Sequence, residues 1–172
     1  MIIQNIQHKI TSNDYDQEII KKCYGHAIKL LAHKDYSQFK LHNKLILKGY
    51  PLDLVENLIE VLIEEKFLRE DYYKEARIKG LLNKGYHPNV IQQKMNLEQC
   101  PVTSYEISDV MSEIHITHES LLEDVINKKL RLIDSLGGGE MDYYKKRDKV
   151  MKFIMSKGHC PDLAKEILNN LL

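Results

Sequence analysis

The turn Lys48-Gly49-Tyr50-Pro51 is the most informative stretch of this sequence, because it marks the end of one helix and the start of the next. A basic residue suits the negative end of a helix, glycine adopts the left-handed cap conformation at little cost, and proline opens a helix without losing a hydrogen bond. The arrangement recurs as Lys84-Gly85-Tyr86-His87-Pro88 and as Lys157-Gly158-His159-Cys160-Pro161. We call these the first, second and third corners, and we predict a positive φ angle at each glycine.

An Asp-Tyr pair precedes each corner, at Asp35-Tyr36, Asp71-Tyr72 and Asp142-Tyr143. The three glycines stand 36 and then 73 residues apart, close to one period and two. A single helix–turn–helix unit cannot bury its own apolar face, so such units stack on one another. The alternative is chance recurrence of a common helix cap. The predicted boundaries are a lead segment at 1–13 and three-helix repeats at 14–68, 69–113 and 114–172.

Apolar residues recur at helical spacing along nearly the whole chain. In the stretch after the first corner, Leu52, Val55, Leu58, Ile59 and Leu62 form the stripe of a helix with one buried face. No segment alternates apolar and polar residues for more than a few positions, so we predict no strand. The expected fold class is all-α. The predicted helices lie near 14–33, 37–48, 51–66, 70–83, 88–96, 104–113, 117–135, 141–157 and 161–171.

The charges are balanced in number but not in position. The chain has 25 Lys and Arg against 25 Asp and Glu. Residues 29–94 and 127–172 carry a basic excess, whereas residues 95–126 contain 7 acidic residues and no Lys or Arg. Such a layout can present one face to a polyanion and another to a protein, although charged residues on ordinary helical surfaces explain it equally well.

The sequence favours a cytoplasmic protein. No apolar run approaches the roughly 18 residues that cross a bilayer, and the N-terminus lacks the pattern of a signal peptide. Cys23, Cys100 and Cys160 are odd in number and far apart, which is typical of a reducing compartment rather than of a disulfide framework. We expect no membrane contact.

A search for catalytic and metal-binding patterns predicts no active site. His115 and His118, with Glu119 beside them, lack the further ligands that zinc needs, and surface histidines are the better interpretation. Cys160 beside His159 lacks a third group to orient it, so we interpret it as a turn cysteine. Gly137-Gly138-Gly139 has neither the Gly-Lys-Ser/Thr ending nor the preceding strand of a phosphate loop, and we predict a flexible joint. We expect no catalytic residue, no metal and no cofactor.

Basic residues interleaved with tyrosines predict binding surfaces instead. Lysines at 40, 44 and 48 form a ridge along one helix, and two further clusters follow along the chain. Such residues suit a phosphate backbone or an acidic groove of a protein. The alternative is that most of the tyrosines simply pack the helix corners. The candidate partner-binding residues are Lys40, Lys44, Lys48, Arg77, Lys79, Lys84, Lys145, Lys146, Arg147, Lys149 and Lys152.

Several of these stretches resemble the RecX family, regulators of the bacterial recombinase RecA. Residues 27–37, a leucine-rich helix followed by a basic, acidic, aromatic and serine turn, are similar to the family's opening. The second corner with the following Ile91 is similar to its central Lys-Gly-Tyr-Gly-Pro motif, although His87 replaces the second glycine. Residues 67–76 match its linker loosely, with Arg69 in place of a usual acid, and residues 152–159 are similar to its closing helix. The resemblance covers about 27–171.

The resemblance implies an elongated, right-handed array of three tandem three-helix repeats. It also implies a monomer that binds RecA and the RecA–DNA filament, lying in the filament groove, and that restrains ATPase and strand exchange in recombination, DNA repair and the SOS response. Weak direct contact with DNA is a further implication, and the family assigns no catalytic residue. The alternative is a helical-repeat protein that binds nucleic acid directly through its lysines, which a steep salt dependence would reveal.

Overall fold

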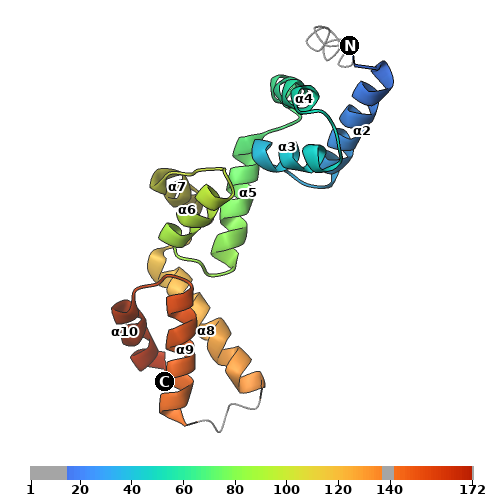
Figure 1. Cartoon of the computed structure of the whole chain (residues 1–172). Helices are drawn as coiled ribbons and strands as arrows, with labels where there is room; N and C mark the ends of the chain where they lie inside the picture. Colours follow the sequence, from blue (N-terminus) through green and yellow to red (C-terminus); the bar gives the residue numbers. More distant parts are fainter. Residues whose placement is uncertain (1–14, 137–141, 172) are drawn as a thin grey trace. The chain divides into compact units, whose positions relative to one another are not determined.

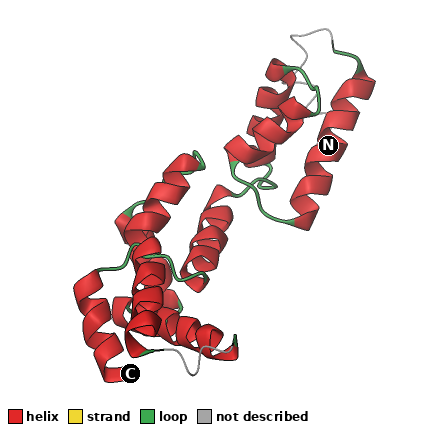
Figure 2. Cartoon of the chain, turned by 60° about the horizontal axis from the view of Figure 1, so that its bottom comes forward, coloured by secondary structure: helices red, strands yellow, loops and turns green. Residues whose placement is uncertain are grey.

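The computed structural model describes residues 15–136 and 142–171, and every regular element in these ranges is an α-helix (Figures 1 and 2). The all-α prediction is confirmed, and the helix ends lie within three residues of the predicted ones. The lead segment 1–13 and Gly137-Gly138-Gly139 lie outside the described residues. The helices are α2 (Gln17–His33), α3 (Gln38–Leu47), α4 (Leu52–Glu64), α5 (Glu70–Asn83), α6 (Pro88–Leu97), α7 (Ser104–Glu113), α8 (His118–Ser135), α9 (Tyr143–Ser156) and α10 (Pro161–Leu171).

Side chains that accept hydrogen bonds from the first turn fix the starts of several helices. Ser37 accepts from the backbone N–H of Lys40 at the start of α3. Thr103 and Glu106 form a reciprocal capping box at the start of α7, and Thr117 and Ser120 form another at the start of α8. These bonds satisfy backbone donors that a helix leaves without partners, so short polar residues determine where each helix begins.

The three corners have the predicted backbone conformation. The φ angles of Gly49, Gly85 and Gly158 are 88°, 75° and 85°, which confirms the prediction. In the first corner the amides of Gly49 and Tyr50 donate to the carbonyls of Ile46 and Leu45, at 2.8 and 3.4 Å. The same pair of bonds closes the helix ends at the second and third corners. Each helix end is therefore satisfied by a left-handed glycine cap.

Three further helix ends use a residue other than glycine in the left-handed region. Lys66 follows α4, Gln99 follows α6 and His115 follows α7, with φ angles of 59°, 53° and 55°. A residue with a side chain is disfavoured in this region, and the sequence therefore gives no sign of these turns comparable to a glycine. The pattern of glycine corners therefore predicted only part of the helix ends.

The chain divides into two compact units, and each has its own core. Unit 1 comprises the described residues up to Ala76 together with 98–100, and unit 2 comprises 77–97 and the described residues from 101 onward. In unit 1, α2, α3 and α4 bury a cluster that includes Leu41, Leu45 and Leu58. The predicted repeat boundaries remain a prediction.

The core of unit 2 includes the faces of α8, α9 and α10 that meet one another. Ile126 of α8, Val150 and Ile154 of α9, and Ala164 and Leu168 of α10 are fully buried in one cluster. Figure 1 shows α9 running between α8 and α10 in this unit. Among the described residues, none of the helices has the length and the apolar character that crossing a membrane requires.

Candidate binding surfaces

Lys40, the first residue of the predicted lysine ridge, is held by internal contacts of unit 1. Its Nζ donates to Tyr73 Oη and to Glu98 Oε2, both at 2.6 Å, and Tyr73 Oη donates to the same Glu98 oxygen at 2.8 Å. Burial lowers the pKa of Lys40, but the bonds to Glu98 and Tyr73 outweigh burial and the pKa is raised. The ammonium joins α3 to α5 and to the segment after α6.

The other two residues of the ridge are exposed. Lys44 lies over the ring of Tyr36, with 5.9 Å between its Nζ and the ring centroid, and Lys48 ends α3 at the first corner. Neither has an ion-pair partner within the described ranges. These two ammonium groups therefore remain available to a partner in solution.

The other two predicted clusters, within residues 77–84 and 145–152, also contain both ion-paired and exposed basic residues. Lys79 pairs with Glu113 at 3.2 Å, Lys146 with Asp134 at 2.7 Å, and Lys152 with Asp148 at 2.7 Å. Of the remaining candidates, Arg77 and Arg147 are half-buried, whereas Lys84, Lys145 and Lys149 are exposed. Unit 1 holds the first cluster and unit 2 holds the other two.

A basic and aromatic strip in unit 2 was not predicted. Lys94 and Lys157 lie over the ring of Tyr86, at 4.5 and 4.0 Å from its centroid. Lys157 and Lys129 lie over the ring of Phe153, at 5.3 and 5.0 Å. Neighbouring residues along this strip come from sequence positions as far apart as 86 and 157, so no sequence window contains the pattern.

The lysines of this strip form no ion pairs with the described residues. None of Lys94, Lys129 and Lys157 has an ion-pair partner in the part of the chain that the structure describes. Lys157, followed by Lys94, lowers the pKa of the Tyr86 hydroxyl. Aromatic rings hold ammonium groups through their negative faces without neutralising them. The strip can therefore attract an anion.

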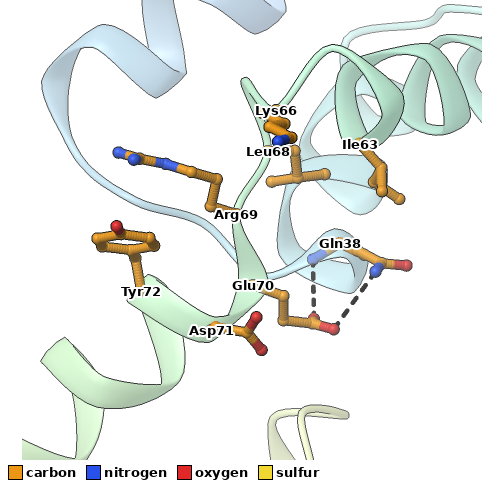
Figure 3. Close-up of a pocket in the computed structure, with 8 residues that line it drawn as sticks. All are labelled: Gln38, Ile63, Lys66, Leu68, Arg69, Glu70, Asp71 and Tyr72. Atoms are coloured by element: carbon orange, nitrogen blue, oxygen red, sulfur yellow. Dashed lines mark hydrogen bonds between the residues drawn. The ribbon is translucent and has the colours of Figure 1, made fainter.

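A cavity of about 420 Å³ opens in unit 1 where α4 passes into α5 (Figure 3). The carboxylate of Glu70 accepts two hydrogen bonds from Gln38, at 3.2 Å from its backbone amide and 3.4 Å from its side chain. The guanidinium of Arg69 lies 4.0 Å from the ring centroid of Tyr72. The polar groups that line the cavity therefore contact one another, and no nucleophile–base pair is found among the lining residues. The lining residues are Gln38, Ile63, Lys66, Leu68, Arg69, Glu70, Asp71 and Tyr72.

Two of the cysteines are buried thiols. Burial raises the pKa of Cys23 to about 12 and contributes most to raising the pKa of Cys100 to about 11. Both therefore remain protonated at neutral pH, and a thiol is a poor nucleophile. Cys160 is exposed at the third corner, as expected of a turn cysteine. Among the described residues, no three His, Cys, Asp or Glu side chains are grouped as metal ligands.

Sequence comparisons relate this chain to one family along nearly its whole length. Residues 23–62 match the family model for the first three-helix domain of RecX. The regulatory protein RecX of Clostridium tetani is 26% identical over 98% of this chain and 76% of the relative. That of Clostridium botulinum (strain Eklund 17B / Type B) is 29% identical over 91% of this chain and 72% of the relative. The chain is therefore similar to regulatory proteins of the RecX family along nearly its whole length.

Solved RecX structures share the fold. The crystal structure of RecX from Lactobacillus salivarius has a TM-score of 0.63 and 21% identity, and the match covers 90% of this chain and 97% of that one. Another crystal structure of a regulatory protein RecX has a TM-score of 0.64 and 16% identity, over 88% of this chain and 73% of that one. A RecX protein of Vibrio cholerae matches over a shorter stretch, 42% of this chain and 48% of the relative.

Proposed function

We propose that this protein is a regulator without catalytic activity that binds the recombinase RecA and its filaments on DNA. It inhibits or modulates the ATPase and strand exchange of RecA in recombination and DNA repair. The observation that carries this proposal is the likeness to a curated regulatory protein RecX over 98% of the chain. The proposal includes a cytoplasmic location and a monomeric state.

Lysines without ion-pair partners among the described residues support contact with an acidic partner. Lys44 and Lys48 in unit 1 are exposed, and Lys94, Lys129 and Lys157 of the strip in unit 2 are half-buried. Complementary charge speeds association and fixes register more than it adds affinity. By contrast, Lys40 is held by Glu98 and Tyr73, so we expect it to contribute to stability more than to binding.

The direct experiment is a RecA ATPase assay on single-stranded DNA with increasing amounts of the purified protein. We expect the steady-state rate to fall in a saturable way, at ratios well below one protein per RecA protomer if the protein acts on filaments. An unchanged ATPase rate together with unchanged strand exchange would remove RecA as the partner. ATP hydrolysis by the protein alone would contradict a role without catalysis.

A charge reversal tests the exposed part of the ridge. Because Lys44 and Lys48 are exposed and lack ion pairs in the described ranges, K44E/K48E should weaken the inhibition of RecA ATPase, whereas the melting temperature should fall by only a few degrees, because K48E places a negative charge at the C-terminal end of α3. The matched control is K21E/K29E, which makes the same change in net charge on exposed positions of α2 in the same unit. Equal inhibition by both variants and the wild type would remove Lys44 and Lys48 from the binding surface.

The second candidate function, direct binding of nucleic acid, rests on the unpaired lysines that flank Tyr86 and Phe153. Each phosphate contact should add roughly 0.7 to the slope of log affinity against log salt for single-stranded DNA. Fluorescence anisotropy with labelled single-stranded DNA therefore measures this function without RecA. If K94A/K157A abolishes DNA binding but leaves ATPase inhibition intact, direct DNA binding is a separate activity.

A further inference from the structure

Three histidines from separate parts of unit 2 meet between the second and third corners. The ring of His87, at the second corner, lies 5.5 Å from the ring of His118 at the start of α8 and 5.5 Å from the ring of His159 at the third corner, between centroids. His159 is only 6% exposed. The three residues are separated by 31 and 41 positions in the sequence, so tertiary packing alone brings them together.

Hydrogen bonds join the two corners in both directions. The Nε2 atom of His159 lies 2.9 Å from the carbonyl oxygen of Gly85, and the backbone amide of His87 donates to the carbonyl of Lys157 at 2.9 Å. A carbonyl oxygen can only accept a hydrogen bond, so Nε2 of His159 carries the proton. In the neutral ring the Nδ1 atom is then unprotonated, and it is the atom that would take up a proton in acid.

The backbone is closely packed beside His159, which is buried, and His87, which is half-buried, whereas His118 is exposed. A Cβ atom on Gly85 would lie 2.3 Å from Val125, and one on Gly158 would lie 2.3 Å from Val90 and 3.6 Å from the Cβ of His87. Protein interiors packed in this way admit little water, so an ionised ring there keeps little of its hydration.

No carboxylate of the described residues offsets the effect of burial on the pKa of His87 or of His159. Burial and then the neighbouring His159 and His118 lower the pKa of His87, and burial, together with His118, lowers the pKa of His159 despite the bond to Gly85. Of the nearest acidic residues along the chain, Glu119 is exposed and Asp162 pairs with Lys165 at 3.1 Å. The ammonium of Lys157 lies over Tyr86 and Phe153 and adds positive charge nearby.

We propose that His87 and His159, with His118 beside the ring of His87, form a pH-sensitive latch, which holds the second corner against the third when the rings of His87 and His159 are neutral and releases it when these two rings take up protons. The proposal goes beyond the recombinase-regulating function and does not depend on it. Release separates the residues that carry Tyr86 and Lys157, and so it also takes apart the basic and aromatic strip. A fall in pH thereby changes the surface that unit 2 offers to an anionic partner.

The direction of the pH effect follows from proton uptake. In the closed protein the pKa values of His87 and His159 lie below the ordinary histidine value of 6.5. At a pH between these lowered values and 6.5, the unfolded or opened chain therefore binds more protons than the closed chain. The stability that the neutral rings contribute is fully present above about pH 6.5. It is lost as the pH falls from there through the lowered values.

Amide hydrogen exchange measured by NMR tests the latch in the intact protein. The protection factors of the His87 and His159 amides should fall between pH 7.5 and pH 5.5, after correction for the intrinsic pH dependence of exchange. The amide of Tyr50, which closes the first corner by donating to Leu45, serves as the internal control and should keep its protection. The proposal would be overturned if the Tyr50 amide lost as much protection as the His87 and His159 amides, or if none of the three amides lost protection.

Substitution by glutamine separates the charge from the hydrogen bond. H159Q supplies an amide N–H for the Gly85 carbonyl but cannot ionise, so H87Q/H159Q should keep its protection at pH 5.5. The control is H33Q, an exposed histidine at the end of α2, which should lose protection as the wild type does. If the double variant does not fold, NMR titration of the imidazoles in the wild type decides. The latch is contradicted if His87 and His159 titrate with pKa values at or above the ordinary histidine value. It is also contradicted if the two rings take up protons while the amides keep their protection against exchange.

Discussion

The three glycine corners share one backbone conformation but differ in the space around them. At Gly49 no heavy atom lies within 4 Å of the position that a Cβ would occupy, whereas at Gly85 and Gly158 a valine methyl lies 2.3 Å away. The positive φ angle therefore favours glycine at all three corners, and close packing favours it further at the last two. The same residue thus has two functions at the second and third corners and one at the first.

Alanine substitutions should separate these two functions. G49A should lower the free energy of unfolding by about 1–2 kcal/mol, the usual cost of a side chain in the left-handed region. G85A should cost roughly 1–3 kcal/mol more, because it also overpacks the contact with Val125. G80A, in the open interior of α5, is the control and should be neutral or stabilise by about 0.5–1 kcal/mol. Urea unfolding measures all three, and equal losses for G49A and G85A would contradict the packing argument.

At the scale of elements, helix ends without glycine carry strain that the chain tolerates. α7 ends at Glu113, and His115 then adopts a φ angle of 55° before Thr117 caps α8. His115 is exposed, and its amide donates to the carbonyl of Ser112 at 3.1 Å. Its side chain therefore contributes little that would offset the strained backbone.

Replacing His115 with glycine should stabilise the protein. H115G removes a left-handed strain of about 1 kcal/mol or more, and the greater freedom of glycine in the unfolded chain offsets part of this gain. We expect a net increase of roughly 0.5–1 kcal/mol in the free energy of unfolding. The control is H115A, which keeps the strain and should be near neutral. A decrease in thermal stability for H115G would mean that the histidine side chain stabilises the turn.

At the scale of the whole molecule, the contacts within the chain form two compact units, and α5 contributes residues to both. Repeats that contact only their nearest neighbours have no common core, so each unit depends on its own buried cluster. The elongated array stays a prediction for the full chain.

Small-angle scattering tests the predicted shape. A compact globule of 172 residues has a radius of gyration of about 15–16 Å, and an array of stacked repeats should exceed it clearly. Light scattering across a range of concentrations serves as the control, since a dimer would also raise the value and we expect a monomer. A monomer with a radius near the compact value would contradict the elongated array.

The helices and the three glycine corners could be predicted from local sequence alone. Helices depend on bonds between residues four apart, on caps such as Ser37 and Thr103, and on apolar spacing, all of which lie within a short window. The left-handed glycines follow from local sterics in the same way. The resemblance to RecX proteins was also recognisable from these local motifs, because the motifs lie at the same helix ends and turns.

The groups of side chains that act together became visible only in the folded structure. Lys40 was predicted as part of a binding ridge, but its contacts are with Tyr73 and Glu98, and nothing near it in the sequence specifies them. The Lys94, Tyr86 and Lys157 strip and the His87, His118 and His159 latch likewise join residues from different helices. Such contacts depend on how the helices pack, which is a property of the whole core, whereas a sequence window records only the interactions within one helix and its turn.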